Sequence, residues 1–207
     1  MNFTDILRHY REFGYFELNN LLTLTNEKKP SVVKKLHRWA LKGNLVRLKR
    51  GFYAFPEQMA KNPLTPERAA NQLYKISYVT GLWRLNQLGL IPEAVFEITN
   101  ATRNNPTRFE TPLGRFTYQH LGEKGFFGYE RIQEGAQEIH VAMPEKALLD
   151  FFWWQKVEWT PQAFQRWRIQ DPWKKINHAK LGMLAEQWGP PRLQRAAKEL
   201  TQYLQVA

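Results

Sequence analysis

The chain has 207 residues, a formal net charge of +11, 43% hydrophobic residues and no cysteine. This hydrophobic content allows a sizeable core and argues against disorder, and the lack of cysteine excludes disulfides and thiolate metal sites. No stretch approaches the roughly 18 apolar residues of a membrane span, and the start of the chain lacks the pattern of a secretory signal. We therefore expect a cytoplasmic protein that does not contact a membrane.

The charge is unevenly distributed along the chain. Residues 1–56 hold eleven Lys or Arg against four acids, a balance of +7, whereas residues 57–159 balance at −1 and residues 160–207 at +5. Basic segments favour polyanions, because each neutralised phosphate releases condensed counterions. A solvated basic surface explains the charge equally well, so the pattern of the basic residues has to decide.

Two short helices are predicted before residue 30. Thr4 is a candidate N-cap for the first helix, which Gly14 is expected to stop. Tyr15 and Phe16 can form a short extended link, and the leucines of the segment 18–22 suit a second helix.

A third helix is predicted from about Pro30 to Lys42, ended by Gly43. Its apolar stripe comprises Val32, Val33, Leu36, Trp39 and Ala40. The other face and the segment just upstream are basic or polar, and they comprise Lys28, Lys29, Ser31, Lys34, Lys35 and Arg38.

The β-prone runs 45–48 and 52–55 predict a hairpin around the turn Lys49-Arg50-Gly51. Three helices followed by a basic hairpin is the order of a winged helix-turn-helix, in which the third helix enters the major groove of DNA. The residues expected to contact DNA are Lys28, Lys29, Ser31, Lys34, Lys35, Arg38, Arg47, Lys49 and Arg50. The alternative is an ordinary amphipathic helix with a solvated lysine face, followed by a surface hairpin.

The expected fold class is α+β, with the winged helix at 1–56, a proline-rich linker at 57–64 and a mixed α/β domain at 65–207. Thr65-Pro66 is expected to start a helix, and β-prone runs alternate with helical patterns up to a strand at 139–143. Pro144 then starts a helix with an almost continuous apolar surface, which predicts burial. From about residue 160 the pattern is helical, with interruptions at Asp171-Pro172 and at Gly189-Pro190-Pro191. The six tryptophans from Trp153 to Trp188 are expected mostly in the core.

Three stretches resemble one known family. They are "GNLVRLKRGFYAF" (Gly43–Phe55), "YVTGLWRLNQLGL" (Tyr78–Leu90) and "VAMPEKALLDFF" (Val141–Phe152). The chain resembles the AbiEi antitoxins of the AbiE-type abortive-infection toxin–antitoxin systems, and its family motif in the second domain comprises Pro144, Glu145, Lys146 and Asp150. Met143 and the pair Thr80-Gly81 depart from the small residues usual in that family, and the tail after Thr160 matches only in general character.

The resemblance implies a bacterial or phage-encoded transcriptional repressor that takes part in phage defence. Members of this family bind inverted repeats in their own promoter through the winged helix. Their C-terminal domain counteracts a nucleotidyltransferase-like toxin, directly or indirectly. Some relatives have no evident toxin, so the alternative is a stand-alone regulator whose second domain senses a ligand or a protein partner.

Enzymatic chemistry is poorly supported by the residue pattern. Glu145 and Asp150 are five residues apart, which places them about 140° apart on a helix. Lys146 and Asp150 are spaced to form an ion pair, and Glu145 can offset the helix dipole. Glu138 and His140 can share one face of a strand, but the histidines show no metal-ligand spacing. We expect no enzyme activity, no catalytic residue, no metal and no cofactor, and we rank a nuclease built on Glu145 or Asp150 well below the other hypotheses.

Overall fold

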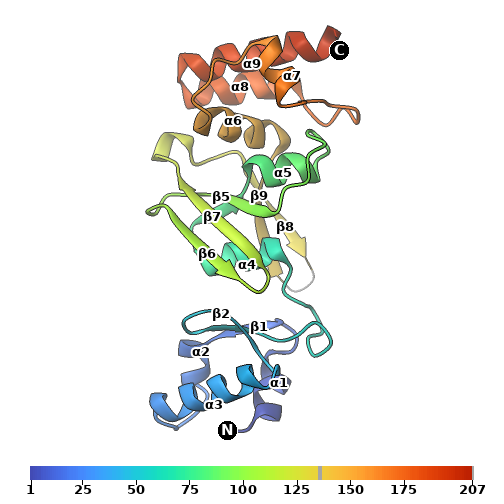
Figure 1. Cartoon of the computed structure of the whole chain (residues 1–207). Coiled ribbons are helices and arrows are strands. Elements are labelled where there is room, and N and C mark those ends of the chain that lie inside the picture. Colours follow the sequence, from blue (N-terminus) through green and yellow to red (C-terminus); the bar gives the residue numbers. More distant parts are fainter. Residues whose placement is uncertain (135–136, 207) are drawn as a thin grey trace.

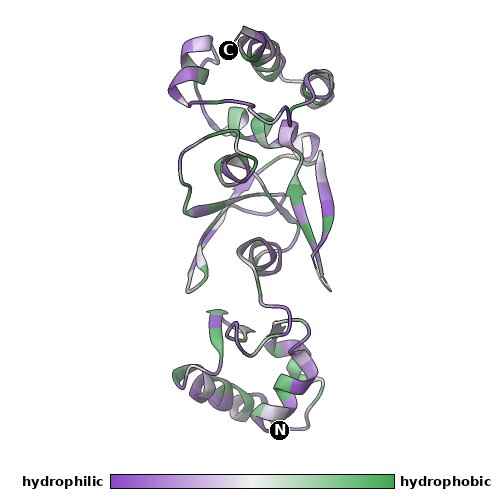
Figure 2. Ribbon diagram, turned by 90° about the vertical axis from the view of Figure 1, so that its right-hand side faces the viewer, coloured by the Kyte–Doolittle hydropathy of each residue, from purple (hydrophilic) through white to green (hydrophobic). Residues whose placement is uncertain are grey.

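The computed structural model describes residues 1–134 and 137–206, which form helices together with two separate β-sheets (Figure 1). Both views of the ribbon show an elongated molecule with its chain ends at opposite ends (Figures 1 and 2). The N-terminal helices form one end, the larger sheet lies in the middle, and the last helices form the other end. The expectation of a mixed α and β fold is therefore confirmed.

The first part of the chain forms three helices and a small antiparallel sheet. Its elements are α1 (Phe3–Tyr10), β1 (Tyr15–Glu17), α2 (Leu18–Leu22), α3 (Lys29–Leu41), β2 (Val46–Lys49) and β3 (Phe52–Ala54). The strand order is β1-β3-β2, so the short extended link after α1 pairs with the second strand of the hairpin. The helices and this sheet enclose one hydrophobic cluster, which includes Ile6, Phe16, Leu21, Val32, Leu36 and Trp39.

The start of α1 differs from the expectation. Its N-cap is Asn2 and not Thr4, because the side chain of Asn2 accepts the backbone N–H of Asp5 at 2.9 Å. The carboxylate of Asp5 in turn accepts the backbone N–H of Asn2 at 3.0 Å. This reciprocal capping box satisfies two N–H groups that a cap at Thr4 would leave open.

Gly14 does not end α1, which stops at Tyr10, but it is required for another reason. Its φ of +78° lies in the left-handed region, and a Cβ added there would lie 2.2 Å from the carbonyl oxygen of Asn62. Only glycine at position 14 allows the backbone of residues 57–64 to pass so close to the backbone of Gly14. That segment, expected as a linker, is packed: Leu64 is buried, and the Asn62 side chain donates to the carbonyl of Glu12.

The second sheet has six strands in the order β6-β7-β5-β4-β9-β8. They are β4 (Ser77–Val79), β5 (Glu97–Thr102), β6 (Thr107–Thr111), β7 (Gly114–His120), β8 (Tyr129–Glu134) and β9 (Gln137–Ala142). The pairs β4–β9 and β5–β7 are parallel, and the others are antiparallel. Because successive side chains of a strand point to opposite faces, Tyr78 belongs to one hydrophobic cluster and Val79 to another.

Helices cover both faces of this sheet. The helix α4 (Pro66–Leu73) packs on the face of Val79, where its cluster also includes Leu48 and Phe52 of the hairpin. The helices α5 (Gly81–Gln87) and α6 (Pro144–Trp154) pack on the face of Tyr78. Beyond β7 lies a short 3₁₀ helix, η1 (Glu123–Gly125). The hairpin is thus in direct contact with the part of the chain that carries the second sheet.

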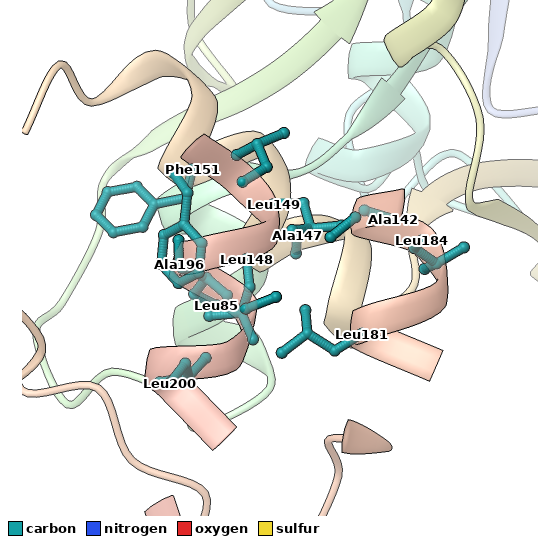
Figure 3. Packing of buried hydrophobic residues seen from close by; sticks show 14 of the residues in the cluster. Leu85, Ala142, Ala147, Leu148, Leu149, Phe151, Leu181, Leu184, Ala196 and Leu200 are labelled. Carbon is teal, nitrogen blue, oxygen red and sulfur yellow. The ribbon is translucent and has the colours of Figure 1, made fainter. Parts of the chain in front are cut away.

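The last helices, α7 (Pro161–Arg166), α8 (His178–Trp188) and α9 (Pro191–Val206), cover the outer side of α6. Figure 3 shows side chains from α6, α8 and α9 gathering in one apolar region, among them Leu148, Leu181 and Leu200. The breaks expected at Asp171-Pro172 and at Gly189-Pro190-Pro191 are both present, and the first of them lies within a loop of residues 167–177. The Asp171 carboxylate accepts the backbone N–H groups of Lys175 and Ile176 at 2.7 and 2.9 Å and so stabilises this loop.

Of the six tryptophans in this half of the chain, Trp159 and Trp188 are buried, whereas Trp173 is 71% exposed. The expectation that these residues belong mostly to the core therefore holds only for some of them. Within residues 1–134 and 137–206, no helix has the length and apolar character needed to cross a membrane.

Candidate nucleic-acid interface

The helix α3 has one buried and one exposed side. Val32, Leu36 and Trp39 are buried in the N-terminal core. Lys34 and Arg38 lie on the opposite side and are exposed, and their spacing of four residues places them next to each other on the helix surface. The helix therefore presents two adjacent cations to solvent.

The cations upstream of α3 and at its start are also exposed. Lys28 is the N-cap residue of the helix, and Lys29 and Ser31 belong to its first turn. In the part of the chain that the structure describes, the side chains of Lys28, Lys29, Lys34 and Arg38 form no hydrogen bond or ion pair. Their charge is available to an anion from outside the molecule.

Lys35 has a different place from the one expected, because it lies on the flank of α3 that faces the N-terminus. Its ammonium group is 2.7 Å from a carboxylate oxygen of Glu27 and donates to the carbonyl of Met1 at 3.0 Å. The amino group of Met1 lies 2.6 Å from the same Glu27 oxygen. The hydrogen bond from Lys35 holds the pKa of Glu27 below its ordinary value. Lys35 thus fixes the loop before α3 and does not belong to the free basic surface.

The hairpin contributes Arg47 and Arg50, which are both exposed. A groove runs between the hairpin and α3, and both arginines line it together with Lys29, Val33 and His37 of the helix. The hairpin turn is made possible by Gly51, whose φ is +78°. The free cations of the hairpin and of α3 therefore border one continuous surface.

Lys49 is the second correction to the expected site. It is the last residue of β2 and not part of the exposed turn. Its ammonium group donates to the carbonyl of Leu73 at the end of α4, and it lies 5.7 Å from the ring centroid of Phe109 in β6. Burial lowers the pKa of Lys49, and this shift is only partly opposed by the charge of Glu17. Lys49 therefore borders the groove, but its ammonium group is engaged by the part of the chain that carries the second sheet.

The sequence interpretation missed two residues of the exposed surface. Val33 was assigned to the apolar stripe, but it is 38% exposed and faces the groove. His37, one turn further along the same flank, lines the groove as well. On a helical wheel Val33 and His37 lie at the edge of the apolar stripe of α3. Their exposure depends on where the hairpin lies, which the sequence of the helix does not give. Both residue types can contact base edges, an apolar methyl group being suited to the methyl group of thymine.

The motif residues of α6 form a second polar cluster, which is closed to solvent. The side chains of Lys146 and Asp150 are fully buried and form the expected ion pair. Asp150 also accepts the hydroxyls of Tyr78 at 2.9 Å and Thr80 at 2.8 Å. The ammonium group of Lys146 lies 4.2 Å from the ring centroid of Trp188. Burial raises the pKa of Asp150 and lowers that of Lys146, whereas their mutual attraction opposes both shifts.

Thr80, Gly81 and Glu145 each have a structural role beside this cluster. Thr80 supplies a hydroxyl to Asp150, and Gly81, with a φ of +60°, leaves only 3.2 Å for a Cβ against Thr99. One carboxylate oxygen of Glu145 accepts the backbone N–H of Asn177 at 2.8 Å. Glu145 therefore connects α6 to the start of α8 and does not form a carboxylate pair with Asp150.

The remaining polar pairs give no sign of a metal centre. The ring of His140 hydrogen-bonds to Glu138 at 2.9 Å on one strand, as the sequence suggested. Among residues 1–134 and 137–206, no three His, Asp or Glu side chains gather in a way that could hold a metal ion.

The sequence matches no model of a known protein family, and no curated protein sequence matches it significantly.

Proposed function

We propose that this chain binds double-stranded DNA through a winged helix-turn-helix formed by residues 1–56. The element order of the N-terminal part and its strand order β1-β3-β2 support this assignment. In such a module α3 is the recognition helix and the hairpin β2–β3 is the wing. The helices α3 and α9 lie at opposite ends of the elongated molecule (Figure 1). The C-terminal helices therefore do not cover α3.

The observation that carries the proposal is the set of exposed cations without internal partners on α3 and the wing. From Lys28 to Arg50 the sequence contains no acidic residue, and Glu17, which lines the groove, lies 3.6 Å from Lys75. In the proposed complex Lys34 and Arg38 reach base edges in the major groove. Lys28 and Lys29 meet phosphates near the helix N-terminus, which favours anions, and Arg47 and Arg50 meet the backbone beside the groove.

The resemblance to AbiEi antitoxins extends the proposal to an autoregulating repressor with antitoxin activity. On this view the chain binds an inverted-repeat operator in its own promoter, and its C-terminal part counteracts a nucleotidyltransferase-like toxin. A regulator without a toxin is the alternative. Expression of the adjacent reading frame separates the two: the antitoxin proposal requires that it arrests growth and that this chain restores growth.

DNA binding is tested by a mobility-shift assay with the duplex that precedes the chain's own reading frame. We expect the variant Lys34→Ala/Arg38→Ala to lose specific binding while its circular dichroism is unchanged. The matched control is Arg195→Ala/Lys198→Ala, which removes the same two residue types from the exposed side of α9. Equal binding by the two variants contradicts the proposed role of α3.

A further inference from the structure

A cavity of about 750 Å³ lies in the C-terminal part, between the loop 167–177 and the end of α9. Ile169, Ile176 and Leu204 line it, and the ring of Tyr203 lines it from α9. Ile169 and Ile176 are buried, so these side chains belong to a fixed wall. The volume lies within the range of about 300 to 1,000 Å³ that is usual for small-molecule sites.

The polar groups that line the cavity include two cations, a histidine and one acid. Lys174 is exposed, and its side chain has no hydrogen bond or ion pair among the described residues. His178 is the first residue of α8, and its Nδ1 atom is buried without a hydrogen-bond partner. The acid that lines the cavity, Asp171, already accepts two backbone N–H groups of its own loop. The cavity therefore offers the free cation of Lys174 and is lined by the imidazole of His178, while its carboxylate is occupied.

The backbone supports this site through an unusual conformation. Arg168 and Lys174, which both line the cavity, have φ values of +50° and +49°. Such values are uncommon for residues other than glycine, and strain of this kind concentrates at functional sites. The guanidinium of Arg168 lies 3.3 Å from Glu93, so Lys174 remains the cation without a partner.

We propose that this cavity binds a small molecule with a flat apolar body and a single anionic group. The apolar body lies between the isoleucines, Leu204 and the ring of Tyr203. The anionic group lies toward Lys174 and His178, where the N-terminus of α8 also favours negative charge. A carboxylate, sulfonate or phosphate group satisfies this chemistry, because each accepts hydrogen bonds from a cation and from the N–H of an imidazole ring.

The test compares two fluorescent probes of nearly the same shape with the full chain. 8-Anilinonaphthalene-1-sulfonate carries an anionic group, whereas N-phenyl-1-naphthylamine is the uncharged counterpart. We expect the sulfonate to bind at one site per chain and the uncharged probe to bind about tenfold more weakly, the usual size of a hydrogen bond to a charged group.

Two variants locate the site. Lys174→Asn removes the charge, and asparagine tolerates the left-handed backbone. His178→Phe keeps a ring but removes its nitrogens. Each is expected to weaken sulfonate binding by about tenfold with unchanged circular dichroism. The control Lys156→Asn removes an exposed cation from another groove of the C-terminal part and is expected to change nothing. The proposal is overturned if the sulfonate does not bind at one site, if both probes bind equally, or if the cavity variants behave like the control.

Discussion

Two lysines of this protein occupy opposite environments. Lys34 lies on the exposed side of α3 without a partner among the described residues, whereas Lys146 is fully buried in α6 and paired with Asp150. A buried charge must be satisfied within the fold, because its desolvation is costly. An exposed charge has no such requirement and is free to meet a ligand. The comparison separates charges that hold the structure together from charges available for recognition.

The largest expected effect is on the free energy of unfolding, and it comes from replacing the buried lysine, Lys146. Lys146→Met leaves the carboxylate of Asp150 buried without its cation, and we expect a loss of about 3 to 5 kcal/mol in the free energy of unfolding. The double variant Lys146→Met/Asp150→Leu removes both charges and is expected to lose less than the single variant. Urea denaturation of both variants measures this difference. A double variant less stable than Lys146→Met would show that the pair is not a coupled unit.

On the exposed side, Arg38→Ala is expected to weaken binding to the preferred duplex by about 1 to 3 kcal/mol, as for a side chain that contacts a base. Its free energy of unfolding should stay within about 0.5 kcal/mol of the original value. Fluorescence anisotropy measures the affinity, and denaturation measures the stability. If Arg38→Ala loses stability but keeps its affinity for DNA, Arg38 holds the fold together and does not contact DNA.

The hairpin contains both kinds of charge side by side. Lys49→Ala leaves the carbonyl of Leu73 without its donor, and we expect a loss of about 1 kcal/mol in the free energy of unfolding, with little change in the affinity for DNA. Arg50→Ala should do the opposite, since Arg50 has no partner among the described residues. Measuring stability and affinity for both variants sharpens the comparison. Identical profiles would show that the orientation of Lys49 has no functional meaning.

The smallest expected effect concerns Glu27 and depends on pH. The hydrogen bond from Lys35 lowers the pKa of Glu27 below its ordinary value of 4.5. A carboxyl with a lowered pKa stabilises the fold above its ordinary pKa and loses this contribution as the pH falls through the lower, folded value. Thermal melts should therefore show a steeper loss on acidification for the original chain than for Glu27→Gln. Parallel curves would contradict the role given to this pair.

The sequence predicts the elements that depend on local patterns. The bounds of α3, the hairpin and the buried helix after Pro144 follow from apolar spacing, glycine and proline. The capping box of α1 is also visible in the sequence, as an asparagine three residues before an aspartate, and it makes Asn2 the N-cap in place of Thr4. These features are set by neighbours in the chain.

The features that were not predicted depend on contacts between distant residues. Lys35 and Lys49 have the same side chain as Lys34. The positions of Glu27 and Met1 hold Lys35, and the position of Leu73 holds Lys49. Such contacts cannot be inferred from spacing alone.

The most direct test of the central claim is the salt dependence of binding to a duplex. Each phosphate contact contributes a slope of about −0.9 to the plot of log affinity against log salt concentration. We predict that Arg47→Ala and Arg50→Ala each make this slope less steep by about 0.9, whereas Lys156→Ala leaves it unchanged. A chain that binds no duplex, or one whose slope does not respond to the wing arginines, would contradict the account.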